Sequence, residues 1–545
     1  MKKPHFLFIA LLSVLLLNSC DQKTKVDLIL TDAQIYTVNN DFDIAESFAV
    51  KDGKFVAVGK KEDILSKYQS DNIIDGSQQF VYPGFNDGHS HFLGYGLMET
   101  KYANLKGTKS FDEVVARVVD HNKSYPGDWI LGRGWDQNDW NDISFPTNEK
   151  LDLAFPDNPV VLTRIDGHAL IANSKALELA SIDIDTHVDG GEIQKSNGRL
   201  TGVLIDNSMR LVRRIIPGFS TDEKALAFKK AQIDCYAVGL TSVTDAGLDK
   251  DEVLLIDELQ SKGELDIRVY AMLSPNNENF DYFFSQGPII KDKLVVSSVK
   301  LYIDGALGSR GALLLEPYSD ALHTHGLQLS PQSYFDNICQ MAYDAGFQVN
   351  THAIGDSGNR IMLKSYAKYL KGKNDKRWRI EHAQVVSPDD LDYFSKYSIV
   401  PSVQSTHCTS DMYWADERLG PERIKHAYAY QDLLNQNGWI VNGTDFPIEG
   451  ISPLRTYYAA VARKDIEEWP NEGFQMENAL SREDALRSIT IWPAMGSFEE
   501  NSKGSIEVGK FADFVLLEKN LISVPETDLP HIKIIGTYID GVKVY

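Results

Sequence analysis

The sequence predicts an α/β protein built on a (β/α)8 TIM barrel, with a small β-sandwich domain formed by both termini and a long insertion after the first barrel strand. Two observations indicate this fold. Short apolar runs alternate with helical stretches through the middle of the 545-residue chain, which is typical of a parallel sheet. Both ends of the chain instead carry short strand segments separated by tight turns.

The predicted barrel strands are apolar runs that end in polar residues. Eight such segments follow one another, which is the number that a TIM barrel needs. Helical stretches are expected between them, including 221–238 after a cap candidate at Ser220 or Thr221, and 387–397. The eight strand segments are 81–91, 241–245, 268–273, 299–304, 348–352, 379–382, 399–404 and 439–445.

The terminal regions have a different sequence pattern from the middle of the chain. Asp52-Gly53 lies between two apolar runs and predicts a β-hairpin, and Asp540-Gly541 marks a turn near the other end. We therefore expect residues 20–82 and 500–545 to form one composite β-sandwich around a barrel domain at 83–499. The run from about 99 to 217 is too long for one strand-to-strand connection, so we expect it to be an insertion.

The first 19 residues predict a secretory signal peptide. Lys2 and Lys3 precede an apolar run at 6–17 that is too short to span a bilayer. Leu17-Asn18-Ser19-Cys20 resembles a bacterial lipobox, which implies cleavage before Cys20 and lipidation of that cysteine. The alternative is a plain signal peptide with a chance cysteine. The expected location is membrane-anchored, periplasmic or at the cell surface.

Composition and charge limit the classes of partner that this protein can bind. The chain is 43% apolar and 24% charged, as folded globular proteins are, and its net charge is -22. A nucleic-acid partner would require a basic face, so the charge argues against one. The three remaining cysteines are scattered, which predicts no disulfide framework and no Cys-x-x-Cys zinc motif. We expect a small-molecule substrate and a membrane contact through lipid, with a homodimer as a further expectation.

Polar residues at the strand ends predict the chemistry. His89 and His91 lie two apart, so their side chains project to the same side of a strand. In a TIM barrel the carboxyl ends of different strands meet at one pocket. Each residue alone has a structural alternative: a hydrogen-bonded histidine, a snorkelling lysine or an aspartate in a turn. Together they predict a two-metal hydrolase site made of His89, His91, Lys300, His352, His382 and Asp445.

Several motifs resemble the metal-dependent amidohydrolase superfamily, and more narrowly its N-substituted formamide deformylase-like and YtcJ-like branch. The resemblance covers nearly all of the mature chain, and its motifs are specific in combination. They are Pro83-Gly84-Phe85 with His89-Ser90-His91, the run from Lys300 to Ala312, Thr351-His352-Ala353-Ile354-Gly355-Asp356, Glu381-His382-Ala383, Gly443-Thr444-Asp445-Phe446-Pro447, Gly504-Ser505-Ile506-Glu507 and Gly509-Lys510-Phe511-Ala512-Asp513.

The resemblance implies roles for these residues. One metal would be held by His89, His91 and Asp445, and a second by His352 and His382. Lys300 would bridge the two if it carries a carbamate; without that group a one-metal site remains possible. The expected cofactor is one or two divalent ions, zinc first. Asp445 would accept the proton of the attacking water and deliver it to a leaving amine.

Substrate contacts are expected from the insertion and the loops. The candidates are Arg164, His168, Arg310, His407 and Trp135. Arg310 could equally form a structural ion pair, and Trp135 could pack inside the molecule. The leading hypothesis is hydrolysis of a C–N bond of the amide type. The alternatives are an ester, lactone or phosphoester hydrolase, a deaminase, and a non-catalytic ligand-binding lipoprotein.

Overall fold

The central unit is a sheet of eight parallel strands. The computed structural model describes residues 23–165, 167, 169–188, 191–206 and 208–545. The strands follow one another in chain order around the sheet, which confirms the predicted TIM barrel. They are β10 (Phe85–Ser90), β17 (Leu240–Leu248), β18 (Arg268–Leu273), β20 (Leu294–Tyr302), β21 (Gln348–Ala353), β22 (Arg379–His382), β23 (Val400–Val403) and β24 (Val441–Asn442).

The first and last strands meet through the chain segments that carry polar residues. The backbone N–H of Asp445 donates to the carbonyl of His89 at 2.8 Å, and the N–H of His91 donates to Phe446 at 2.8 Å. The Asp87 carboxylate also accepts the backbone N–H of Thr444 at 3.0 Å. These bonds nearly close the barrel and fix the end of the first strand against the segment after the eighth.

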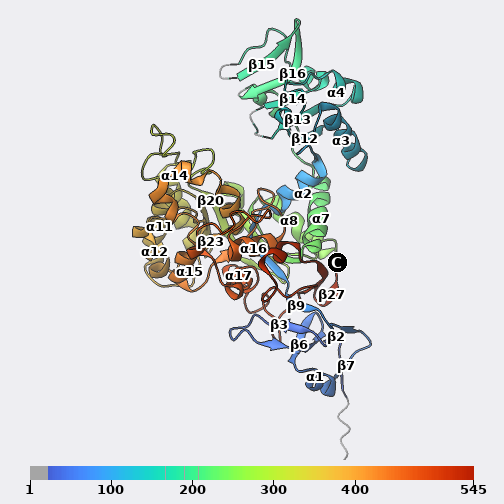
Figure 1. Ribbon diagram of the computed structural model, residues 1–545, viewed down its shortest axis with the longest axis vertical. Coiled ribbons are helices and arrows are strands. Elements are labelled where there is room, and N and C mark those ends of the chain that lie inside the picture. Colours follow the sequence, from blue (N-terminus) through green and yellow to red (C-terminus); the bar gives the residue numbers. More distant parts are fainter. Residues whose placement is uncertain (1–22, 166, 168, 189–190, 207) are drawn as a thin grey trace, which may run out of the picture.

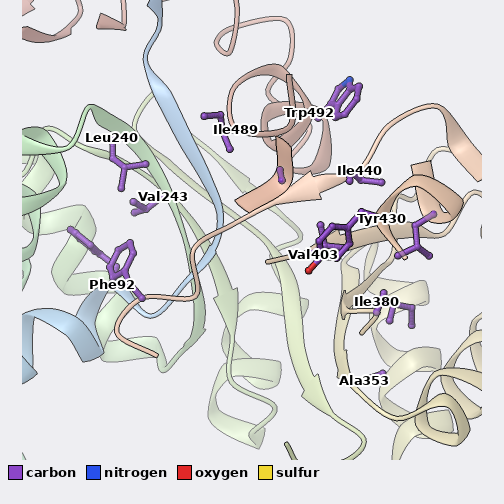
Figure 2. Close-up of a cluster of buried hydrophobic side chains, with 14 of the residues drawn as sticks. Phe92, Leu240, Val243, Ala353, Ile380, Val403, Tyr430, Ile440, Ile489 and Trp492 are labelled. Carbon is purple, nitrogen blue, oxygen red and sulfur yellow. The ribbon is translucent and has the colours of Figure 1, made fainter. Parts of the chain in front are cut away.

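Helices surround the barrel and cover its outer face. Parallel strands are buried on both faces, so outward side chains need apolar partners. Figure 2 shows this core, in which Val243 lies near Phe92 and Val403 and Ile380 lie near Tyr430. The helices of this unit are α2 (Phe92–Lys101), α7 (Thr221–Ala237), α8 (Lys250–Ser261), α9 (Asn277–Asn279), α10 (Gln332–Ala345), α11 (Asp356–Leu370), α12 (Asp392–Tyr397), α13 (Ser405–Asp411), α14 (Ala415–Arg423), α15 (Tyr430–Asn437), α16 (Pro453–Ala462), α17 (Arg482–Ser488) and α18 (Ile491–Gly496).

The start of α7 follows the cap expected from the sequence. The Ser220 hydroxyl accepts the backbone N–H of Glu223, and the Glu223 carboxylate accepts the backbone N–H of Ser220 at 2.8 Å. This capping box satisfies donors that the first helical turn leaves free. The helix therefore begins at Thr221, as predicted.

The part of the chain between α2 and α7 forms a separate sheet. Its six strands have the order β11-β12-β13-β14-β16-β15, and apolar side chains fill both of its faces. We call residues 102–213 the insertion; it occupies the end of the molecule opposite the terminal sheets (Figure 1). Its elements are β11 (Tyr102–Asn104), α3 (Phe111–Ser124), β12 (Ile130–Trp135), α4 (Glu149–Ala154), β13 (Val160–Arg164), β14 (Ala169–Ala172), α5 (Ser174–Leu179), β15 (Gly191–Ser196), β16 (Arg199–Asp206) and α6 (Met209–Arg213).

Amino-terminal strands form a sheet ordered β6-β5-β2-β8, and strands from both ends of the described chain form another, ordered β27-β26-β25-β9-β3-β4. The apolar run at 81–83, expected to lead into the first barrel strand, belongs to β9 here; the barrel strand begins at Phe85. The elements are β2 (Leu28–Thr31), β3 (Gln34–Tyr36), β4 (Ile44–Ala45), β5 (Ser47–Lys51), β6 (Lys54–Gly59), α1 (Lys61–Lys67), β8 (Ile73–Asp75), β9 (Phe80–Pro83), β25 (Phe514–Leu517), β26 (Ile534–Ile539) and β27 (Val542–Lys543). Among the described residues, no helix combines the length and apolarity needed to cross a membrane.

Candidate active site and metal centre

The six residues expected to hold metal gather at one end of the barrel. Because the strands are parallel, their carboxyl ends share that end. His89 lies in β10 and His91 directly before α2, while Lys300, His352 and His382 lie in β20, β21 and β22. Asp445 follows β24 and is tied to β10 by its backbone bond to His89. We call this region the mouth.

A first group of candidate ligands consists of His89, His91 and Asp445. Their ligand atoms all lie within 4.8 Å of one another. The Asp445 Oδ1 atom is 3.3 Å from His91 Nε2 and 3.7 Å from His89 Nε2. This oxygen is buried and has no hydrogen-bond partner among the described residues. Two imidazoles and a free carboxylate oxygen form a donor set that suits a divalent cation such as zinc.

The orientation of His89 is fixed from behind by Glu381. The His89 ring is fully buried, and its Nδ1 lies 2.5 Å from Glu381 Oε2. The Ser402 hydroxyl donates to the same oxygen at 2.6 Å. Burial alone would raise the pKa of Glu381, but the nearby His89 and Arg379 lower it to about 2. An ionised Glu381 accepts the Nδ1 proton, which leaves the Nε2 lone pair of His89 directed into the mouth.

A second group shares Asp445 and adds His382 and His407, again with ligand atoms within 4.8 Å of one another. The His407 Nε2 atom lies 3.2 Å from Asp445 Oδ2, and its Nδ1 lies 3.2 Å from Glu449. Burial opposes charge on His407, but the carboxylates of Asp445 and Glu449 raise its pKa to about 10. The two carboxylates therefore favour positive charge at this position, either a proton or a cation.

Lys300 and His352 complete the wall of the mouth. The Lys300 Nζ atom is buried 3.1 Å from His89 Nε2, and burial lowers the pKa of Lys300 to about 8. The His352 ring lies 4.5 Å from the His382 ring, centroid to centroid. Burial lowers the pKa of His352 to about 3, so its imidazole is neutral, and its Nε2 has no hydrogen-bond partner among the described residues. A neutral imidazole with a free nitrogen can bind a metal.

Two of these residues hold unusual backbone conformations. His382 has φ 73° and Asp445 has φ 60°, in the left-handed region that non-glycine residues rarely adopt. At His382 this breaks the alternation of the strand, so Glu381 and His382, although adjacent, both approach His89. Such strain costs about 1–3 kcal/mol per residue and persists at sites where the surroundings fix the geometry.

The comparisons with known proteins agree with this geometry. Residues 72–545 match the family model described as "Amidohydrolase family". This chain belongs to the amidohydrolase family. It is a metal-dependent hydrolase of that family, with candidate metal-binding histidine and aspartate groups at the mouth.

Similar proteins come from a plant and from bacteria. Protein LONG AFTER FAR-RED 3 of Arabidopsis thaliana is 33% identical over 541 residues, covering 95% of this chain and 91% of its own length. YtcJ of Bacillus subtilis is 30% identical over 521 residues, with 94% and 98% covered. An N-substituted formamide deformylase of Arthrobacter pascens is 25% identical over 546 residues, with 95% and 98% covered.

One solved structure shows the same fold at similar identity. An uncharacterized metal-dependent hydrolase from Pyrococcus horikoshii is 29% identical and superimposes with a TM-score of 0.78. The match covers 92% of this chain and 99% of the other. The relatives therefore extend over the insertion and the terminal sheets as well as the barrel.

The expected substrate contacts of this amidohydrolase need correction. Trp135 does not face the mouth: its side chain is fully buried in the insertion, where its indole N–H donates to Leu162 at 2.8 Å. Arg164 pairs with Asp136 and donates to Gln137 at 2.8 Å within the insertion, and its predicted substrate contact stays a prediction. Arg310 forms the ion pair that was its structural alternative, with Asp320 at 2.7 Å. His168 and the lipidation candidate Cys20 lie outside the described residues.

His407 lies at the mouth, against Asp445 in the second ligand group, where His352 was expected. Its predicted contact with substrate stays a prediction. His352 lies beside His382 and belongs to neither group of described residues. The first turn of α13 carries His407 back over the mouth, and a sequence does not reveal such a short helix after a strand.

Three further residues were missed by sequence reasoning. Glu381 positions His89, and Glu449 positions His407. Tyr302 is 39% exposed, and its ring centroid lies 5.5 Å from that of His352 and 5.0 Å from Lys300 Nζ. Tyr302 has the same parity as Lys300 on its strand, and that spacing could have identified it as a neighbour of the site.

Proposed function

We propose that this amidohydrolase cleaves the C–N bond of an N-substituted amide, with formyl or another small acyl group passing to water. The position of Asp445 between the two histidine groups carries the proposal. An amine leaves readily only after protonation, and a carboxylate beside the attacking water can take a proton and return it to the nitrogen. The relative named as an N-substituted formamide deformylase supports this choice of bond.

The proposed ligands and the residues around them have different roles. His89, His91 and Asp445 would hold one divalent cation, and His382, His407 and Asp445 a second. Zinc is the ion that we propose, because imidazole and carboxylate are its usual ligands. Such a cation, when bound, lowers the pKa of water and polarises a substrate carbonyl. Asp445 then accepts and returns the proton, while Glu381 and Glu449 keep the imidazoles of His89 and His407 in place.

We propose in addition that Lys300 carries a carbamate. A buried ammonium without a carboxylate partner is costly, and no described carboxylate lies within ion-pair distance of Lys300. Reaction of the neutral amine with CO2 would replace this cation by an oxygen donor that faces His89. Mass spectrometry under CO2 should show the added group, and CO2-free buffer should lower activity; an unmodified, fully active enzyme would contradict the proposal.

The test of the proposed function is a substrate panel with metal-reconstituted protein. The panel pairs N-formyl and N-acetyl amines with formate and acetate esters of matching alcohols. We expect turnover of the amides that depends on added zinc and disappears with chelator. Hydrolysis of esters alone, or release of ammonia from ring substrates, would instead assign another bond to the same site. No turnover of any class by metal-loaded protein would overturn the proposal.

For the amino terminus we propose export and lipidation at Cys20. The support is the sequence of residues 2–20 alone. Radiolabelled palmitate should label the wild-type protein in bacterial cells, and Cys20→Ser should remove the label and release the protein from membranes. A wild-type protein that remains unlabelled and soluble would contradict this proposal.

A further inference from the structure

A cavity of about 410 Å³ lies between the insertion and the mouth. It is lined by the end of α2, by β11 and β12 with the residues that follow them, and by the segment after Asp445. The lining is mixed. Tyr102, Met98, Ile165 and Ile448 supply apolar surface, and Ile165 and Ile448 are 41% and 68% exposed. Exposed aliphatic side chains that face one cavity favour an apolar ligand group there.

The cavity is tied directly to the catalytic residues. Pro447 and Ile448 follow Asp445 by two and three positions, and the backbone N–H of Ile448 donates to the Asp445 carbonyl at 2.9 Å. On the opposite side, α2 begins directly after His91 and carries Met98 into the cavity wall. Two segments of the cavity wall therefore continue directly from the proposed metal ligands His91 and Asp445.

Two exposed cations line this cavity. They are Arg133 and Lys106, and neither makes an ion pair or a side-chain hydrogen bond with a described residue. Glu99 is the single carboxylate among the described lining residues, and burial raises its pKa, which disfavours its charge.

The backbone places the two cations on and after neighbouring strands. Arg133 pairs with Asn104 in the parallel ladder of β11 and β12, and its carbonyl accepts the N–H of Leu105 at 2.8 Å. Gly134 follows with φ 109°, and a Cβ there would lie only 2.7 Å from Lys106 Cγ. Glycine at this position therefore leaves room for the Lys106 side chain against β12.

We propose that this cavity binds a carboxylate-bearing substituent of the substrate, with Arg133 and Lys106 as the charge contacts and the aliphatic wall holding an adjacent apolar group. An arginine fork and a lysine ammonium form charge-assisted hydrogen bonds to a carboxylate, and Arg133 is the better geometric match. The inference rests on the proposed function and adds a substrate class: amides whose amine portion carries both an anionic and an apolar group.

The experiment compares two substrates that differ by one carboxylate, N-formylphenylalanine and N-formyl-2-phenylethylamine. The variants are Arg133→Met, Lys106→Met and the double change. Arg199→Met is the matched control, because Arg199 is an exposed arginine of the same insertion that lines a different cavity. We expect each single change to lower kcat/KM for N-formylphenylalanine about tenfold to a hundredfold, with the neutral substrate changed less than about twofold.

Equal effects on both substrates, or an unchanged double variant, would overturn the inference. A wild-type enzyme that hydrolyses neither substrate would instead count against the proposed function. A binding measurement keeps the inference testable in that case: calorimetric titration of the metal-free protein with 3-phenylpropionate and with its neutral amide. We expect the wild-type protein and the control to prefer the carboxylate and the double variant to lose that preference. Equal binding of the carboxylate by all forms would reject the site.

Discussion

The mouth of the barrel and the insertion both place polar side chains at strand ends, but the predicted site residues of the two regions differ in how they are paired. His352 Nε2, His382 Nδ1 and Asp445 Oδ1 are buried without hydrogen-bond partners among the described residues. In the insertion, Trp135 and Arg164 have theirs. Burying an unpaired polar group is unfavourable, so three such atoms gathered at the mouth favour a ligand there, whereas Trp135 and Arg164 need none. The comparison teaches that free donor atoms identify a site better than residue type does.

The largest expected effect is at the mouth, from Asp445→Asn. Loss of the carboxylate removes the proton acceptor, and kcat should fall about 10²–10⁴-fold. Circular dichroism should show an unchanged fold, and elemental analysis should show metal still bound through the histidines. Asp251→Asn, an exposed change on α8, is the control. Retention of full activity would remove Asp445 from the reaction.

The next largest effect is expected from a change in the insertion, which should not affect the reaction at the mouth. Trp135→Ala removes a fully buried indole that packs near Trp140 and Phe145. The free energy of unfolding of the insertion should fall by about 3–5 kcal/mol, as measured by denaturant titration. Trp135→Phe should cost less, because a smaller aromatic ring remains, although the bond to Leu162 and part of the buried volume are lost. If Trp135→Ala left the stability normal and raised only KM, Trp135 would contact the substrate as the sequence predicted.

A smaller effect is expected at Glu381, which positions His89 of the first ligand group. Glu381→Gln keeps the shape of the side chain but removes the charge that holds the Nδ1 proton of His89. Metal affinity should fall about 10–100-fold, measured by competition with a chelating dye. Ser402→Ala, which removes one hydrogen bond to Glu381, should have a weaker effect in the same direction. Unchanged metal affinity in Glu381→Gln would show that His89 needs no such support.

The smallest effect is expected from Arg164→Met. Arg164 is partly buried and bonds to Asp136 and Gln137 within the insertion. Its loss should lower the free energy of unfolding by about 1–3 kcal/mol, the range for a hydrogen bond to a charged group. Because these partners lie in the insertion, kcat/KM should stay near the wild-type value in steady-state assays. A large drop in kcat/KM with unchanged stability would place Arg164 at the substrate.

The sequence was a good guide where chemistry and strand topology coincide. His89, His91, His352, His382 and Asp445 lie at the ends of predicted parallel strands and Lys300 lies within one, and parallel strands end together. It was a poor guide in the insertion, since an arginine or tryptophan there serves packing as readily as binding. Arg133 and Lys106 gave no signal, because their placement depends on a strand pairing and on the close approach that Gly134 permits.

The sequence by itself determined the barrel and the residues that meet at its mouth, because apolar periodicity sets the strands and their polar ends follow. The tertiary structure decided which contacts each of those residues makes at the mouth. The left-handed backbone at His382 turns Glu381 and His382 toward the same imidazole, and α13 returns His407 to Asp445. Such assignments depend on contacts between segments far apart in the chain, which local patterns do not encode.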